Sequence, residues 1–135
     1  MMETPMDRID KILNHDLFLY HLGRNNAAEA DRRFCRHSMV HFLDVARIGT
    51  IIALEEGLKI DREWIYAAAL LHDCGKHEQY ENGTPHEQAS ARIAPEILKA
   101  CGFNDEETGV IVTALSSHRD PEAAKEKNLN GILYR

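Results

Sequence analysis

The spacing of apolar residues constrains this chain most strongly, because it follows the period of an α-helix almost everywhere. No stretch alternates between apolar and polar residues for long enough to indicate a β-strand. Helices are expected over roughly residues 9–20, 26–36, 37–56, 62–73, 85–101 and 104–118, with a last one beginning at 129. The sequence therefore predicts an all-α bundle of six or seven helices.

The same spacing predicts which helix faces are buried. Each predicted buried face is a stripe of residues along one side of a helix. The stripe of the first helix comprises Ile9, Ile12, Leu13, Leu17 and Tyr20, and that of the third comprises Val40, His41, Val45, Ile48 and Ile52. Gly57 and Gly75 mark helix ends, and Asp61 is the expected N-cap of the apolar helix that follows it. Pro95 predicts a kink or a break within its helix.

Two helix starts carry capping signals. Thr84, Pro85 and Glu87 combine an N-cap, a proline at the first helical position and a capping-box glutamate. Asn104 and Glu107 repeat the capping-box pattern before the next helix. We expect both helices to begin at these residues.

The composition is that of one ordinary globular domain. The chain has 135 residues, 44% apolar and 28% charged, with a formal net charge of −6. This acidic balance disfavours nucleic-acid polymers and anionic membranes as partners, and no apolar run is long enough to span a bilayer. Three dispersed cysteines cannot form a disulfide scaffold, which favours a cytoplasmic protein. We expect a single domain over 1–135, in which N-terminal helices (1–36) pack on a core formed by 37–135.

Four of the eight histidines lie on faces that their helices should bury. They are His41, His72, His86 and His118, each on a different helix. One such histidine is usually a core residue with a satisfied hydrogen bond, but four on separate helices favour a shared role. The neighbouring Asp73 joins them, whereas His15, His21 and His77 fall in expected turns or polar helix ends and need no special explanation.

This residue set predicts a metal site. Imidazole and carboxylate groups are ligands for divalent metals, and the cores of helical bundles are where such sites are built. Adjacent helical residues point about 100° apart, so His72 and Asp73 can face one ion only where their helix ends. Gly75 predicts that end. In the first turn of its helix, His86 is held in the neutral form that metal ligation requires.

Four segments place these residues in a characteristic order. They are H-F-L-D-V-A (41–46), A-A-A-L-L-H-D-C-G-K (67–76), P-H-E-Q-A-S-A (85–91) and S-S-H-R (116–119). The order resembles the HD-domain superfamily of metal-dependent phosphohydrolases, over about residues 37–135. The histidine-aspartate pair would be weak evidence alone, but the Ala-Ala-Leu-Leu before it and the Gly-Lys after it make the resemblance specific.

The resemblance implies a helical fold in which His41, His72 and Asp73 hold one metal ion. It also implies that Asp73 bridges to a second ion held by His86 and His118. The sequence does not distinguish Fe, Mn, Zn, Ni and Mg, and it leaves open whether one or two ions bind.

The last motif of the family is an aspartate that follows a segment similar to residues 132–135, where the given sequence ends. We therefore expect the native chain to continue past Arg135 and to supply that ligand. Asp120 lies near His118 but does not match the position, and a solvated loop residue is the simpler interpretation.

The expected chemistry is hydrolysis of a small phosphate ester, such as a nucleotide, by metal-activated water. Asp73 and Lys76 are the candidate catalytic residues, and Lys76, Arg119 and His37 are the candidate substrate contacts. The alternatives are that Lys76 and Arg119 are ordinary surface cations and that His37 is structural. No serine or cysteine lies in a recognisable nucleophile motif.

Two other functions stay open at this point. Without the last aspartate, the chain could be a metal-binding regulatory or degenerate module without turnover. The same ligand set could instead support a di-iron oxygenase, since the scaffold is known to host oxidative chemistry. We expect the hydrolase, with a small phosphorylated substrate as its partner.

Overall fold

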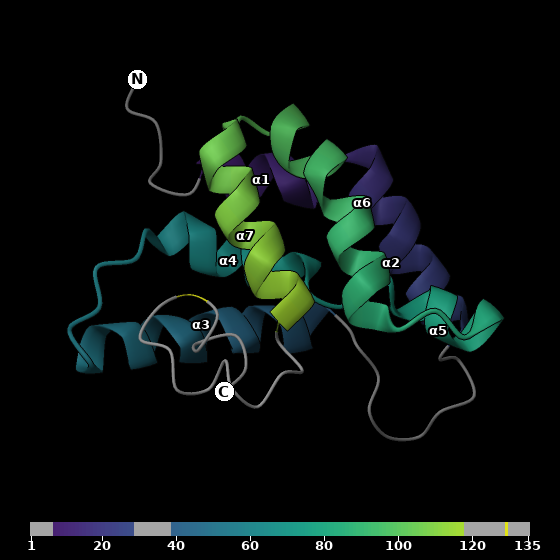
Figure 1. Ribbon diagram of the computed structural model, residues 1–135, viewed down its shortest axis with the longest axis horizontal. Coiled ribbons are helices and arrows are strands. Elements are labelled where there is room, and N and C mark those ends of the chain that lie inside the picture. Colours follow the sequence, from purple (N-terminus) through teal and green to yellow (C-terminus); the bar gives the residue numbers. More distant parts are fainter. Residues whose placement is uncertain (1–6, 29–38, 118–128, 130–135) are drawn as a thin grey trace.

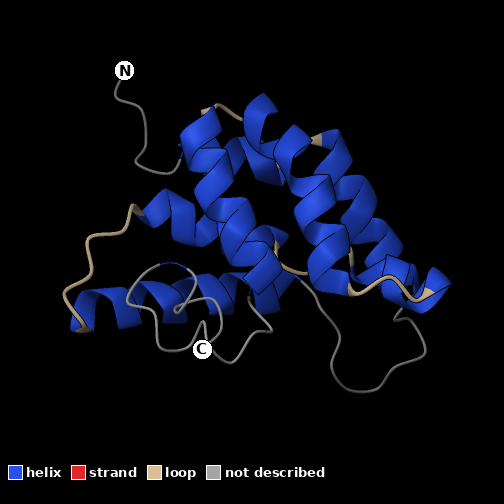
Figure 2. Cartoon of the chain, viewed as in Figure 1, coloured by secondary structure: helices blue, strands red, loops and turns tan. Residues whose placement is uncertain are grey.

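Figure 1 shows the computed structural model, which describes residues 7–28, 39–117 and Leu129. Within these residues every regular element is a helix (Figure 2), as the sequence predicts. The helices are α1 (Asp7–Leu13), α2 (Asp16–Ala28), α3 (Met39–Glu55), α4 (Arg62–Leu71), α5 (Lys76–Asn82), α6 (His86–Ala100) and α7 (Asp105–Ser117). Most of the helix expected over 26–36, and all but one residue of the helix expected from 129, lie outside the described residues.

The first predicted helix is in fact two helices, because the chain turns at 14–15. The backbone N–H of Leu17 donates to His15 Nδ1 at 3.1 Å, and this contact caps the start of α2. The expected stripe is therefore correct for Ile9 and Ile12, which are buried, and wrong for Tyr20, which is 53% exposed.

The buried face predicted for α3 is wrong. The structure buries Phe42, Ala46, Gly49 and Ala53 and leaves Val40 and Ile48 68% and 56% exposed. Three of the four residues on the buried face are alanine or glycine, and α4 is the main neighbour of α3. Hydrophobic spacing gave more weight to the large branched side chains than to alanine and glycine.

The helix α4 forms the centre of the bundle. It contacts α3, α7, α1 and α6, and its residues from Ala67 to Leu71 are all buried. It begins as predicted, because the Asp61 side chain accepts a hydrogen bond from the backbone N–H of Glu63. This burial fixes the end of α4, where the candidate metal ligands lie.

The helix α6 departs from its predicted start. Its N-cap position is Pro85, and the Thr84 hydroxyl donates to Asn82 Oδ1 instead of capping the helix. The predicted capping box with Glu87 is therefore wrong. The expectation at Pro95 was a kink or a break: the break is absent, since α6 runs from His86 to Ala100 with that proline inside it, and the kink stays a prediction.

The capping box at the start of α7 is confirmed. Asn104 N–H donates to Glu107 Oε1 at 3.1 Å, and Glu107 N–H donates to Asn104 Oδ1 at 2.8 Å. The Glu107 carboxylate also accepts from Arg8 of α1 at 2.9 Å and from Trp64 of α4 at 2.7 Å. This carboxylate therefore joins three helices.

Among the described residues, no helix has both the length and the apolar character needed to cross a bilayer.

Candidate metal centre

His72 and Asp73 lie where α4 ends. The last helical residue is Leu71, His72 is the C-cap, and Cys74 N–H donates to the Leu71 carbonyl in a turn that leads into α5. A second turn bond follows, from Lys76 N–H to the Asp73 carbonyl at 3.0 Å. Because the helix stops here, two consecutive side chains can face one place, as the sequence predicts.

Gly75 is required by packing and not by a left-handed cap. Its φ is −94°, and it stands at the N-cap of α5. A Cβ at this position would lie 2.5 Å from Ala89 Cβ and 2.7 Å from the backbone nitrogen of Ser90. The Gly75 N–H donates to Ser90 Oγ at 3.0 Å. The glycine therefore lets the turn after Asp73 contact α6 directly. The helix ends before Gly75 as predicted, but not through a left-handed glycine cap.

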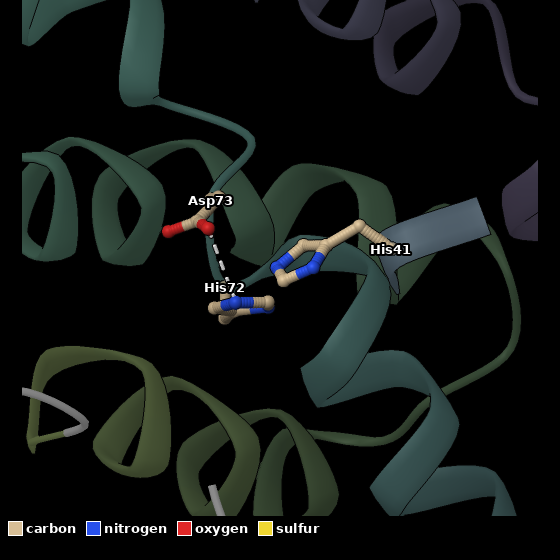
Figure 3. Close-up of side chains that lie close together, drawn as sticks. All are labelled: His41, His72 and Asp73. Carbon is tan, nitrogen blue, oxygen red and sulfur yellow. Dashed lines mark ion pairs between the residues drawn. The ribbon is translucent and has the colours of Figure 1, made fainter. Parts of the chain in front are cut away.

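His41, His72 and Asp73 converge on one point (Figure 3). Each offers one ligand atom, and the three atoms lie within 4.8 Å of one another. His72 and Asp73 are buried, 7% and 4% exposed. His41 is exposed, contrary to the buried face predicted for it, but its ring still lies beside that of His72, with centroids 6.2 Å apart.

The hydrogen bonds of His72 determine which of its nitrogens can bind a metal. Nδ1–H donates to the backbone carbonyl of Ala69, so the lone pair of the neutral ring is on Nε2. Nε2 lies 3.1 Å from Asp73 Oδ2. Two acceptors at this distance need a proton or a cation between them, and a metal ion supplies the cation. The donor set therefore fits a divalent metal.

Without a metal ion, a proton on His72 can take the place of the cation between His72 and Asp73. Burial lowers the pKa of His72, but the charge of Asp73 and hydrogen bonds to Asp73 and Ala69 outweigh it, so the pKa is raised overall. A metal ion would compete with this proton.

His86 faces the other oxygen of the same carboxylate. It is the first residue of α6, it is buried, and its Nε2 lies 3.4 Å from Asp73 Oδ1. Asp73 therefore has an imidazole on each side, His72 at Oδ2 and His86 at Oδ1. A carboxylate with this surrounding can bridge two ions. The other predicted ligand of the second ion, His118, lies outside the described residues, as do the candidates His37 and Arg119 and the residue Asp120.

Lys76 lies at the mouth of the site. It begins α5, with Nζ 3.4 Å from His86 Nδ1 and 5.7 Å from the centroid of the Tyr80 ring. His86 also lines an open pocket of about 460 Å³, together with Gln79, Gly83, Pro85 and Glu87. His86 therefore lies between the Lys76 ammonium group and a space that a ligand can enter.

The buried Cys74 thiol is not a nucleophile at neutral pH. Burial raises its pKa to about 12, although a hydrogen bond with Ser90 acts in the opposite direction. Hydrolysis at this site would therefore use water and not a cysteine.

Two features around the site were not predicted from the sequence. His21 and His77 were assigned to polar surroundings, but both are buried, and His21 Nδ1 lies 2.8 Å from His77 Nε2. Asn25 is fully buried and binds the backbone on both sides of the turn: it donates to the Asp73 carbonyl and accepts from the His77 N–H. The Arg24-Asn25-Asn26 sequence carries no periodic signal that singles out the middle residue.

A helical bundle with a histidine-aspartate cluster at the end of its central helix defines a class of metal-site proteins. The HD domain family matches residues 39–134, so the chain belongs to this family, whose members are metal-dependent phosphohydrolases as a group. A protein of Clostridium beijerinckii, named only as an uncharacterized protein, is 48% identical over 130 residues, which cover 96% of this chain and 81% of the relative. No solved structure gives a significant match.

Proposed function

We propose that this protein is a phosphohydrolase that cleaves a small phosphate ester, with a nucleotide as the expected kind of substrate. The observation that carries the proposal is the position of the Asp73 carboxylate, between His72 Nε2 and His86 Nε2 and beside His41. A carboxylate and imidazoles of this kind suit one or two divalent ions, of which Fe, Mn, Zn, Ni and Mg are the candidates. A bound ion would supply a Lewis acid for a phosphoryl oxygen and acidify a water molecule.

The residues of the chain have separate roles in this proposal. His41, His72 and Asp73 would hold the first ion, and Asp73 with His86 and His118 would hold the second. Asp73 would be a ligand of both ions and therefore counts as catalytic. The role of Asp73 depends on its orientation, which the buried turn after α4 fixes.

Among the residues that the structure describes, Lys76 is the proposed phosphate contact. Its ammonium group lies 3.4 Å from Nδ1 of His86, a proposed metal ligand that also lines the open pocket. A cation there would neutralise phosphate oxygens during hydrolysis. Arg119 and His37 remain proposed contacts from the rest of the chain. A substrate of limited size suits this pocket better than a polymer does.

The test is a hydrolysis screen on the purified protein. The protein is stripped of metal, reloaded separately with Fe²⁺, Mn²⁺, Zn²⁺, Ni²⁺ or Mg²⁺, and assayed with phosphomonoesters, phosphodiesters and nucleotides. We expect phosphate or nucleoside release with at least one ion, and its loss in Asp73→Asn. The matched control is Asp44→Asn, an exposed aspartate of α3 that contacts only Arg47 among the described residues.

The same screen separates the other functions. A regulatory module would bind metal but release no product from any substrate. A di-iron oxygenase would consume oxygen only in the iron-loaded form. Metal binding without hydrolysis under every ion would therefore overturn the proposed activity and leave the metal site intact.

A further inference from the structure

The side chain of Gln79 makes two contacts with one residue. Its Oε1 lies 3.1 Å from the backbone nitrogen of His86 and 2.8 Å from His86 Nδ1. Gln79 itself lies on α5, where its backbone carbonyl accepts from the N–H of Gly83 at 3.1 Å. This helix end has a left-handed glycine, with φ of 81°, so the chain turns back toward α6 and places Gln79 against its first residue.

The backbone contact fixes the orientation of the Gln79 amide. A backbone N–H can only donate, so the atom that faces it must be the carbonyl oxygen and not the NH₂ group. This contact also satisfies the start of α6, because Pro85 at the N-cap has no side-chain cap. Gln79 therefore caps the start of α6, a role that the sequence pattern predicted for Thr84.

The fixed amide in turn determines the hydrogen position on His86. Nδ1 lies at hydrogen-bond distance from the same oxygen, so it must carry the hydrogen and donate it. Two other groups lie near Nδ1. The Lys76 ammonium group, at 3.4 Å, could donate only to an Nδ1 without hydrogen, and the Nδ1 lone pair would then face the Gln79 oxygen at the shorter distance of 2.8 Å, so the Gln79 contact decides. Glu87 Oε2, at 3.7 Å, is beyond hydrogen-bond distance. The lone pair of the neutral ring is then on Nε2, which lies 3.4 Å from Asp73 Oδ1.

We propose that Gln79 is a positioning residue that holds His86 in the Nδ1–H tautomer, so that the Nε2 lone pair is directed to the metal position beside Asp73. Its importance for metal binding rests on the proposed function, but the tautomer itself does not. The arrangement parallels His72, whose Nδ1–H donates to the Ala69 carbonyl while Nε2 faces the other oxygen of Asp73. Such outer partners commonly set the orientation and tautomer of metal-ligating histidines.

Two substitutions at position 79 show whether the side chain acts as a hydrogen-bond acceptor or only fills space. Gln79→Met keeps the length of the side chain and removes the acceptor, whereas Gln79→Glu keeps an oxygen that both His86 groups can bond. Gln88→Met is the matched control, because Gln88 is exposed on α6 two residues from His86.

The first readout is the tautomer of His86 in metal-free protein, measured at pH 8 from long-range ¹H–¹⁵N correlations of the imidazole. We expect the Nδ1–H form in the wild type, Gln79→Glu and Gln88→Met, and a mixture or the Nε2–H form in Gln79→Met. The Nε2–H form in the wild type, or an unchanged Nδ1–H form in Gln79→Met, would overturn the proposal.

The second readout is calorimetric titration with Zn²⁺ alone. Loss of an outer partner commonly weakens metal binding by roughly tenfold to a hundredfold. We expect this loss of Zn²⁺ affinity in Gln79→Met, and if two Zn²⁺ ions bind, we expect it for the ion that binds more weakly. Gln79→Glu should restore the affinity, and Gln88→Met should leave it unchanged. Equal affinity in all four proteins would contradict the role of Gln79. If none of the four proteins binds Zn²⁺ or any of the other four candidate ions, the metal site on which the proposed function rests is contradicted, and the tautomer measurement still decides the position of the hydrogen.

Discussion

The buried side-chain amide of Asn25, on α2, donates a hydrogen bond of 2.9 Å to the backbone carbonyl of Asp73. The oxygen of the same amide accepts from the His77 N–H at 2.8 Å. An N-terminal helix thus fixes both ends of the turn that carries a candidate metal ligand. This link gives α2 a role in the site, although none of its side chains belongs to the proposed ligand set.

We predict that Asn25→Leu destabilises the protein and weakens metal binding. The change leaves the buried His77 N–H without its Asn25 partner, at a cost of roughly 1–3 kcal/mol. It also removes one of two hydrogen bonds to the Asp73 carbonyl, which keeps the bond from the Lys76 N–H. Urea denaturation measures the loss of unfolding free energy, and metal titration measures the loss of affinity. The control is Asn26→Leu at the exposed neighbouring position. If the two variants behave alike, the Asn25 link does not support the site.

We predict that Gly75→Ala is destabilising, because its Cβ would collide with Ala89 and with the backbone of Ser90. Overpacking of this kind costs roughly 1–3 kcal/mol, and relief of the clash would displace α6 and therefore His86. Gly23→Ala is the matched change: nothing lies within 4 Å of its added Cβ, and alanine in a helix is favoured by roughly 0.5–1 kcal/mol. Thermal unfolding should move in opposite directions for the two variants. A neutral Gly75→Ala would mean that the α5–α6 contact is looser than the structure shows.

The sequence predicts the helical class and the grouping of His41, His72 and Asp73 better than it predicts the packing around them. Asp61 and the Asn104–Glu107 pair work as expected because capping is a local interaction. The buried face of α3 was predicted wrongly because that face includes Ala46 and Gly49, whose small side chains carry little hydrophobic signal.

Long-range contacts explain the other errors. His21 and His77 are separated by 56 positions, so no local pattern indicates that their rings share a hydrogen bond. The cap of α6 is similar: the N–H of His86 is satisfied by Gln79, seven residues earlier, and not by the adjacent Thr84. Sequence spacing identifies faces, and only the fold shows which faces meet.

We predict that the metal-free protein loses stability through His21 as the pH falls below neutrality. Burial lowers the pKa of His21, and the charge of His77 lowers it further. The folded state therefore binds this proton less readily than the unfolded chain, whose histidine pKa is about 6.5. The contribution of His21 is fully present above that pH and declines as the pH falls toward the lowered folded value.

The measurement is urea denaturation between pH 8 and pH 5 in the presence of a chelator. His21→Gln keeps a polar partner for His77 but cannot titrate, so its stability should fall less steeply with acid than that of the wild type. His72 contributes in the opposite direction, because its raised pKa gives stability at low pH that is lost as the pH rises through the folded value. Since both proteins contain His72, their difference isolates His21. Parallel profiles would count against the shift at His21.

We predict that Lys76→Ala lowers the rate of hydrolysis and leaves the metal content and thermal stability nearly unchanged. A charge-assisted contact to phosphate contributes roughly 1.5–3 kcal/mol, which corresponds to a loss of about tenfold to a hundredfold in rate. The assay is steady-state kinetics on the best substrate found, with the exposed Lys59→Ala as control. An unaltered rate would contradict the phosphate contact and would indicate that Lys76 is an ordinary surface cation.

The central claim is that Asp73, held between His72 and His86, binds a divalent metal. The most direct test is metal content and metal affinity, measured by elemental analysis and titration on the wild type, Asp73→Asn and the exposed control Asp44→Asn. The substitution Asp73→Asn keeps the shape of the side chain and removes its charge. We predict stoichiometric binding of at least one of Fe, Mn, Zn, Ni and Mg by the wild type and Asp44→Asn, and its loss in Asp73→Asn. Full-strength stoichiometric binding by Asp73→Asn, or no binding of any of these ions by the wild type, would contradict the claim.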